Sequence, residues 1–516
     1  MKRYLFLTHR WLGIALCLFV AMWFLSGIVM MYVGYPRLTL AERLSALPEL
    51  DAARCCADLA TAIAAADERH APQTIRLTMA AHTPRFIFSF DKDRFVAVDA
   101  RSGARSSAVT PEEAVASACA FMSGAEGTYE GTIDEDAWTH SKALEGHRPL
   151  HRVQMADPAG TLLYVSGTTG EVVRDASRTE RIWNWAGAWI HYLYLFRGGI
   201  FDAYWKDIIV YTSLTATILA AIGLTVGLLR WRFRGHYTSG SKSPYRGGYM
   251  RWHHLSGLAF GLFALTWIFS GMMSMNPWKI FDSPTRLDLR AYAGGEFDAE
   301  RFPLGVAQAL TIFAGNHFHP REIEWRILDG KGYYIGHNDA GQTLILPAQA
   351  GAVPLAMFPI EQLEHAGARL VEHAKVKAKT VLTAYDFYYY GRAPHTMAGT
   401  TEKRLPVLRL EFNDPQATWT HIDPYTGAVL RKLDLRQRWH RWLFAFPHSW
   451  DWRPLIEARP LWDVLLIVLS IGGFLVSCTG IVIGWHRLKR KQGKPGRKNP
   501  PVSDVSNAHP LKTVEL

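Results

Sequence analysis

An apolar segment near the start of the chain constrains the fold more than any other feature. Residues 9–31 read HRWLGIALCLFVAMWFLSGIVMM, and residues 11–36 carry no charged side chain. A helix of about 20 apolar residues crosses the hydrocarbon core of a membrane. Shifted by 244 positions, the segment matches residues 253–275, HHLSGLAFGLFALTWIFSGMMSM. The second copy is internal and no cleavage site closely follows the first, so both are predicted to be membrane spans. The shared positions include His9/His253, Gly13/Gly257, Trp23/Trp267, Ser26/Ser270 and Gly27/Gly271.

Two further apolar runs, residues 208–229 and 464–485, bring the number of predicted spans to four. The short segment 230–251 contains Lys and Arg but no acidic residue, and basic residues also mark both chain ends. Such segments stay in the cytoplasm, so the two large loops are predicted to be extracytoplasmic. In a bacterial inner membrane they would face the periplasm. The net charge of +11 is concentrated in these short segments, which argues against a nucleic-acid surface.

The predicted fold is a four-span α-helical bundle that carries two large extracytoplasmic α+β domains. The predicted segments are a cytoplasmic N-terminus (1–8), a first span (9–33), a first outer domain (34–181), an outer interfacial helix (182–204), a second span (205–229), a basic cytoplasmic loop (230–251), a third span (252–276), a second outer domain (277–437), a second interfacial helix (438–460), a fourth span (461–486) and a disordered cytoplasmic tail (487–516).

The end of each large loop and the span after it repeat as well, at an offset of 257 positions. The two repeats together predict a parallel duplication about a pseudo-twofold axis along the membrane normal. Within the loops, apolar periodicity predicts helices over 49–66, 111–122, 303–315 and 360–374. Turns closed by glycine predict hairpins over 94–105, 161–173 and 418–430. The matched positions include Pro149/Pro406, Arg152/Arg409, Trp185/Trp442, His191/His448, Trp205/Trp462, Gly223/Gly480 and Gly227/Gly484.

Several motifs carry a resemblance to a known family. The hairpins VSGTTGEVV and IDPYTGAVL resemble the end of a PepSY domain. The HRWLG start of the first span, the SG near its far end and the histidine before the second span resemble the PepSY-associated transmembrane family. The resemblance covers roughly residues 4–490 and implies PepSY-like outer domains. Members are similar to a ferrisiderophore reductase of the inner membrane that holds two b-type haems.

Only two pairs of histidines hold equivalent places in the two halves. His9 and His253, the inner pair, stand at the cytoplasmic ends of spans one and three, and His191 and His448, the outer pair, precede spans two and four. A bis-histidine b-type haem takes one neutral imidazole on each side of its iron. The duplication and the resemblance together predict two haems b, with iron bound by these four residues. The plainer interpretation makes each histidine an anchor at the membrane surface.

Three other histidines stay open as ligands. His254 adjoins His253 but lies about 100° around the helix, so only one of the two can face the axis. His440 and His486 stand near the outer and inner faces, without histidine counterparts in the other half. Glycines on the first and third spans would let a flat macrocycle approach, and those on the second and fourth are predicted to serve helix packing alone. The first group is Gly13, Gly27, Gly257 and Gly271, and the second is Gly223, Gly227, Gly480 and Gly484.

The expected function is an oxidoreductase that carries electrons across the membrane to a periplasmic ferric complex, a ferric siderophore if the resemblance holds. Residues 385–392, YDFYYYGR, could bind an aromatic or anionic chelate through Tyr388, Tyr389, Tyr390 and Arg392, or could form a buried strand between domains. No catalytic residue is assigned. The sequence lacks nucleotide-binding motifs, so a separate cytoplasmic protein, a reduced flavin or a quinol is expected to donate electrons.

Two other functions remain open. The PepSY-like domains could bind a peptide or peptidase in a regulatory membrane protein, with structural histidines. A transporter of siderophore or iron is the third interpretation. Apart from Arg10 at the edge of the first, however, the apolar runs hold no charged residue that would mark a transport pathway. Cys55, Cys56 and Cys119 lie in the first loop, where they could form a disulfide or serve as small buried residues.

Overall fold

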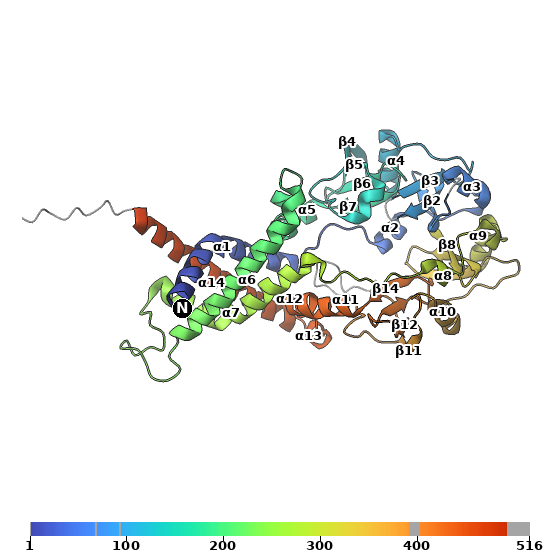
Figure 1. The fold of residues 1–516 in the computed structure, drawn as a ribbon. Coiled ribbons are helices and arrows are strands. Elements are labelled where there is room, and N and C mark those ends of the chain that lie inside the picture. Colours follow the sequence, from blue (N-terminus) through green and yellow to red (C-terminus); the bar gives the residue numbers. More distant parts are fainter. Residues whose placement is uncertain (1, 68–69, 92–93, 392–402, 493–516) are drawn as a thin grey trace, which may run out of the picture.

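A computed structural model describes residues 2–67, 70–91, 94–391 and 403–492. A bundle of long helices forms one end of an elongated molecule, and three β-sheets form the other (Figure 1). The N-terminus, the loop between helices α6 and α7, and the end of α14 lie together at the end of the bundle remote from the sheets (Figure 1). Of the predicted disordered tail (487–516), residues 487–492 are helical instead, as the end of α14, and the rest lies outside the described residues.

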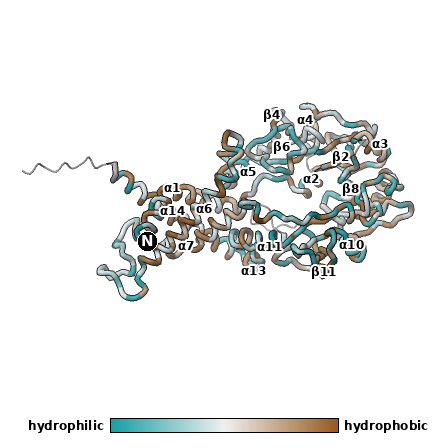
Figure 2. Tube along the Cα trace, in the orientation of Figure 1, coloured by the Kyte–Doolittle hydropathy of each residue, from teal (hydrophilic) through white to brown (hydrophobic). Residues whose placement is uncertain are grey.

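Four helices are long and apolar enough to cross a membrane, which indicates a multi-pass membrane protein. In the bundle, α14 packs between α1 and α7, and α6 packs against the other side of both. Apolar residues cover most of these helices (Figure 2). The helices are α1 (Lys2–Met30), α6 (Trp205–Arg230), α7 (Gly248–Ser274) and α14 (Leu461–Gln492). At the end of the bundle remote from the sheets, α1, α7 and α14 extend beyond the predicted spans. The added residues of α1 and α14 include Lys and Arg, which are good helix formers.

The largest sheet joins strands from both halves of the chain. Its order is β10-β9-β8-β1-β2-β3, and β1 and β8 pair antiparallel with Ile75 opposite Trp325. Phe86, Phe88 and Phe313 are fully buried in the core beneath it. The predicted division into separate outer domains does not anticipate this shared sheet. Its strands are β1 (Thr74–Ala80), β2 (Thr83–Asp91), β3 (Arg94–Asp99), β8 (Glu322–Leu328), β9 (Lys331–His337) and β10 (Thr343–Pro347).

Each half also has its own four-stranded antiparallel sheet nearer the bundle. The predicted hairpins at 161–173 and 418–430 are confirmed, and Gly170 and Gly427 take the positive φ that their turns require. The first sheet contains β4 (Gly127–Ile133), β5 (Leu150–Met155), β6 (Leu162–Ser166) and β7 (Val172–Ala176). The second contains β11 (Val376–Leu382), β12 (Val407–Phe412), β13 (Trp419–Ile422) and β14 (Val429–Leu433).

Short helices cover the sheets and connect them to the bundle. The single helix predicted over 49–66 is wrong, because Asp58 caps a shorter helix by accepting a hydrogen bond from the Thr61 amide. Before it, a 3-10 turn (Ala52–Arg54) is followed by extended residues. The short helices are α2 (Leu40–Ala46), α3 (Leu59–Ala66), α4 (Pro111–Phe121), α5 (Arg178–Asn184), α8 (Leu289–Ala293), α9 (Val306–Gly315), α10 (Ile360–Gly367), α11 (Leu435–His440), α12 (Phe446–Ser449) and α13 (Arg453–Glu457).

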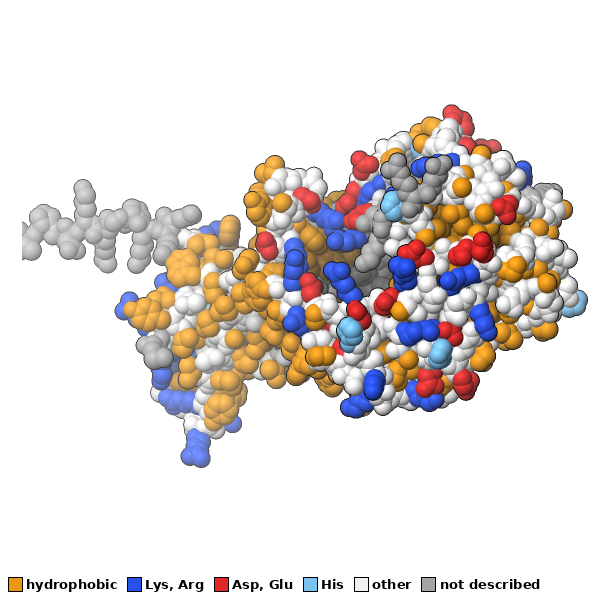
Figure 3. Space-filling view, turned by 45° about the vertical axis from the view of Figure 1, so that its right-hand side comes forward, with side chains coloured by type: hydrophobic (Ala, Val, Ile, Leu, Met, Phe, Trp, Pro, Cys, Tyr) orange, Lys and Arg blue, Asp and Glu red, His pale blue; other side chains and the backbone are white. Residues whose placement is uncertain are grey.

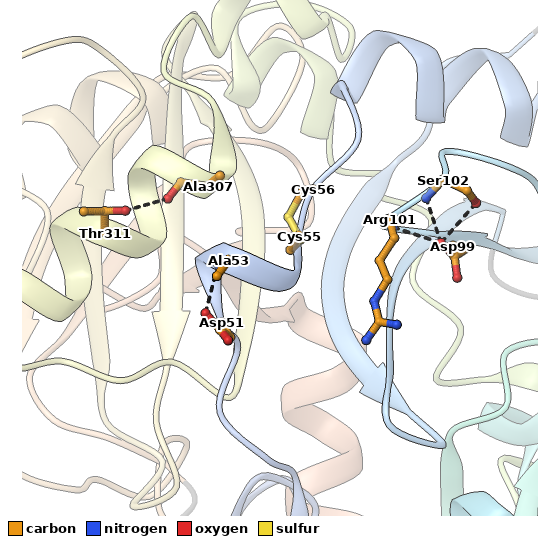
Figure 4. Close-up of a disulfide and its surroundings, with 9 residues drawn as sticks. All are labelled: Asp51, Ala53, Cys55, Cys56, Asp99, Arg101, Ser102, Ala307 and Thr311. Atoms are coloured by element: carbon orange, nitrogen blue, oxygen red, sulfur yellow. Dashed lines mark hydrogen bonds between the residues drawn. A yellow bond between two sulfur atoms is a disulfide. The ribbon is translucent and has the colours of Figure 1, made fainter.

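The extended residues before α3 contain a disulfide between the adjacent Cys55 and Cys56. It lies between the turn that holds Arg101 and helix α9 (Figure 4). Cys119 forms no disulfide within the described residues, so the possibility raised by the sequence is realised by the adjacent pair.

A buried cluster of four charges connects α2, the shared sheet and the first four-stranded sheet. The Glu322 carboxylate accepts hydrogen bonds from Arg43 at 2.7 and 2.9 Å and from Arg76 at 2.7 Å. Arg76 also binds Glu171, in the turn between β6 and β7, at 3.1 Å. The two arginines hold the pKa of Glu322 well below its usual range, despite its burial. The segment that leaves the first span is thereby fastened to the sheets.

Candidate functional site

The outer histidines are carried by two similar structures at the sheet end of the bundle. In each, a short helix passes into a π-helical turn, Trp185–Trp189 or Arg441–Ala445, shortly before the histidine. Two residues after each histidine the chain reverses through a residue with positive φ, Leu193 at 51° or Trp450 at 49°. π-Helical turns are rare and frequently occur at functional sites.

Tryptophans of the spans hold these structures in place. The Trp205 indole N–H donates to the Tyr192 carbonyl at 2.8 Å, and the Trp462 indole N–H donates to the Ser449 carbonyl at 3.2 Å. Trp23 on α1 likewise donates to the carbonyl of His191 at 3.0 Å. Each outer histidine therefore has a backbone position fixed by neighbouring helices.

The outer pair is brought together between α1 and α7. The ring centres of His191 and His448 lie 6.4 Å apart. The Nδ1 atom of His191 lies 3.0 Å from the Ser26 hydroxyl, and that of His448 lies 3.1 Å from the Ser270 hydroxyl. Both hydroxyls donate to carbonyls of their own helices, so each accepts a hydrogen bond from the Nδ1–H of its histidine. This tautomer leaves both Nε2 atoms with lone pairs, as iron ligation requires.

The inner pair lies near the end of the bundle remote from the sheets, with the ring centres of His9 and His253 6.1 Å apart. The Nδ1 atom of His253 lies 3.0 Å from the Val476 carbonyl, which only accepts, so Nδ1 carries the proton and Nε2 has the lone pair. The Nδ1 atom of His9 is buried and has no hydrogen-bond partner within the described part of the chain. Ser26 lies 17 residues after His9, so the two pairs are about 25 Å apart along the bundle.

His254 faces away from the inner pair. Its Nε2 atom lies 3.0 Å from the Gly227 carbonyl and therefore carries the proton, and its Nδ1 atom lies 2.8 Å from the Ser243 hydroxyl. Both ring nitrogens thus bind the protein, and neither offers a lone pair toward the bundle axis. Of the two adjacent histidines, the structure brings only His253 to His9.

The other two alternative ligands pack against aromatic rings, and His486 also lines the cavity that His9 and His253 line. His440 packs against Phe281 and Phe444, with ring centres 4.7 and 5.1 Å away. His486 is exposed on α14 and packs against Tyr249 at 6.1 Å. In the described structure neither ring stacks or hydrogen-bonds with another histidine.

Both pairs have the spacing of two imidazoles that share one metal ion. A metal–imidazole bond is about 2 Å long and the nitrogen lies about 1.1 Å from the ring centre, so opposite ligands place their ring centres about 6.2 Å apart. The observed distances are 6.1 and 6.4 Å. The spacing of each pair therefore fits two imidazoles that bind one haem iron.

A glycine lies against each of the four imidazoles. A Cβ atom on Gly223 would lie 2.6 Å from Cε1 of His9, and one on Gly480 would lie 3.4 Å from Cε1 of His253. For Gly27 with His191 and Gly271 with His448, the corresponding distances are 3.8 and 3.4 Å. The sequence had suggested only helix packing for Gly223 and Gly480. Gly227 and Gly484 do serve packing, because Leu258 and Ile14 fill the space beside them.

A cavity of about 590 Å³ opens beside the inner pair, within the size range of cofactor sites. Small and apolar residues of all four spans line it, including Gly13 and Gly257 as the sequence predicted. Arg10, Arg230 and Arg487 line it at the end remote from the sheets. The cavity combines an apolar interior with a basic mouth.

The tyrosines predicted to bind a chelate contact the protein itself. Tyr389 is fully buried and stacks on His421 with ring centres 5.1 Å apart. The Tyr390 hydroxyl donates to Asp451 at 2.6 Å, and the Tyr388 hydroxyl lies 3.2 Å from the indole nitrogen of Trp442. These contacts agree with a segment packed between domains. Arg392, the fourth predicted contact, lies outside the described residues.

No protein-family model matches this chain, and no curated protein matches it. The geometry defines a class nonetheless, a multi-pass membrane protein with an α+β part at one end of its bundle and two histidine pairs within it. The likeness to the PepSY-associated transmembrane family continues to depend on the sequence motifs alone.

Proposed function

We propose that this protein transfers electrons across a membrane through two b-type haems, one held by the inner pair and one by the outer pair. The observation that carries this proposal is the repeated imidazole spacing of 6.1 and 6.4 Å at opposite ends of one apolar bundle. Haem iron with two imidazole ligands supplies one-electron oxidation and reduction. Serine and carbonyl acceptors hold three of the four imidazoles in the ligating tautomer.

The two halves of the chain support this function as a parallel duplication. Equivalent positions carry the π-helical turns, the residues with positive φ and the tryptophan hydrogen bonds. A pseudo-twofold axis makes equivalent histidines face each other, which is how two copies of one ligand complete a site. Between the two pairs the bundle is packed with apolar and aromatic residues such as Phe24 and Trp267, whose ring centres lie 6.0 Å apart.

The electron acceptor is a ferric chelate on the outer side of a bacterial inner membrane, with a ferric siderophore as the form that the family resemblance favours. Basic side chains gather around a hollow between the bundle and the sheets (Figure 3), and a cationic surface there would attract an anionic chelate. Electrons would enter from a cytoplasmic protein, a reduced flavin or a quinol. PepSY-like outer domains would present the chelate to the outer site.

An optical spectrum of the purified protein tests the cofactor. Dithionite should produce the sharp absorption bands of reduced haem b, with two haems per chain. His191→Ala and His253→Ala should each lose about half of the haem, because each destroys one of two sites. His440→Ala serves as the matched control and should keep both. A protein that contains no haem when purified from haem-supplied cells would disprove the proposal.

The acceptor needs a separate experiment under anaerobic conditions. Reduced protein mixed with a ferric siderophore should be reoxidised, and a colorimetric ferrous chelator should trap the iron released. The gallium(III) complex of the same siderophore has a similar charge and shape but is not reducible, so it should leave the haem bands unchanged. Equal reoxidation by both complexes would contradict ferric reduction.

A further inference from the structure

We infer that Arg10, Arg230 and Arg487 bind the two carboxylates of the inner haem and so orient it with those carboxylates toward the cytoplasm. The inference rests on the proposed function, because it concerns the same cavity. The three arginines come from α1, α6 and α14, and all line one end of the cavity beside the inner pair. Arg10 directly follows the ligand His9.

The charges at this mouth have no counter-ion nearby in the sequence. Residues 1–41, 208–281 and 464–503 contain no Asp or Glu, and these ranges include every segment that forms the cytoplasmic end of the bundle. The guanidinium of Arg230 lies over the Phe6 ring at 4.4 Å, which holds it at the mouth without neutralising it. An anionic group of a ligand in the cavity could therefore form charge-assisted hydrogen bonds with these three guanidinium groups.

The shape of the cavity selects the kind of anion. Beyond the arginines and histidines most of its walls are apolar or glycine, with residues such as Val20, Phe24 and Ile268 at the far end. The polar exceptions are Tyr245, Tyr249 and Ser477. A ligand that fills it must have a broad apolar body and anionic groups at one edge only. Haem b has this form, since both of its carboxylates project from one edge of an apolar macrocycle. A phospholipid head group offers the same charge, so the experiment has to separate the two.

Haem dimethyl ester is the direct probe, because it keeps the iron and the macrocycle but has no carboxylate. Haem-free protein, purified from cells starved of haem precursor, is titrated with haem and with the ester while the Soret band is recorded. An outer-site variant, His191→Ala, restricts binding to the inner site. We expect the ester to bind about 100-fold more weakly, since each charge-assisted contact is worth about tenfold.

Equal affinity for haem and ester in this protein would overturn the inference while leaving the proposed function intact. Binding of neither compound would instead contradict the proposed function. The two failures are therefore distinguishable, and both are measured without any substitution among the arginines. A variant that folds poorly cannot obscure the result.

Substitution of the arginines then tests whether they cause the difference in affinity between haem and its dimethyl ester. Arg10→Gln, Arg230→Gln and Arg487→Gln together should abolish the preference for haem over its ester and lower the midpoint potential of the inner haem, because removal of positive charge disfavours the reduced iron. Arg251→Gln is the control, since it removes a cation of the same cytoplasmic end that does not line the cavity. If the triple variant keeps the preference and loses only bound phosphatidylglycerol in native mass spectrometry, the arginines serve lipid and the inference fails.

Discussion

Gly223→Ala should release the inner haem although it removes no ligand. The added Cβ atom would lie 2.6 Å from Cε1 of His9, whereas ordinary contacts begin near 3.4 Å. The imidazole must therefore retreat by about 1 Å, and a metal–ligand bond tolerates about 0.2 Å. Since α6 cannot yield without disturbing its packing against α1 and α7, the ring is the part that moves.

Gly27→Ala is the matched control for this prediction. It also adds one methyl group to a span glycine that faces a proposed ligand, but its Cβ would lie 3.8 Å from Cε1 of His191, an ordinary contact. Pyridine haemochrome assays and redox titrations of both purified variants give the readout. Gly223→Ala should retain about one haem and one midpoint potential, and Gly27→Ala should retain two. Full haem content in Gly223→Ala would refute the assignment of His9 as a ligand pressed against this helix.

Three further predictions concern the outer part of the molecule. Glu322→Gln should destabilise the protein by about 3 kcal/mol, because Glu322 is about 4% exposed and its loss leaves two arginines to share one carboxylate. Thermal unfolding followed by tryptophan fluorescence should show the lower stability. Glu296→Gln, which changes an exposed carboxylate, is the control and should unfold like the wild type. The pKa of Glu322 is lowered in the folded protein, so its contribution is complete above the unfolded value of about 4.3 and declines as pH falls below it. As pH falls below about 4.3, the melting temperature of the wild type should therefore decrease faster than that of Glu322→Gln. An equal decrease in both proteins would contradict a lowered pKa of Glu322. Finally, a maleimide should label Cys119 before reduction and Cys55 and Cys56 only after it, as mass spectrometry of peptides can show.

Local patterns in the sequence predicted the parts of the fold that local interactions determine. Apolar length identified the four long helices, and glycine-closed turns identified the hairpins around Gly170 and Gly427. The helix predicted over 49–66 failed because periodicity could not show that Asp58 would start a new helix inside it. The pairing of β1 with β8 was also missed, since it joins residues about 250 positions apart and no local signal records such a contact.

In the candidate site too, the sequence predicted some features, and others depend on contacts between distant segments. Duplication identified both histidine pairs, because equivalent positions in the two halves can be compared directly in the sequence. It did not separate His253 from His254, since the choice depends on acceptors that other helices supply, Val476 on α14 and Gly227 on α6. Gly223 and Gly480 were assigned to packing because their spacing resembles that of packing glycines. Their contact with imidazoles appears only once the helices are assembled.

The sheet shared by the two halves has a mechanical consequence. The halves meet at one end through the helical bundle and at the other through the ladder between β1 and β8, so the chain forms a closed frame. Rocking of one half against the other, as alternating-access carriers require, would have to break that ladder. A frame of this kind would keep the two proposed haem sites at a constant separation, which favours steady electron flow over the movement of a cargo.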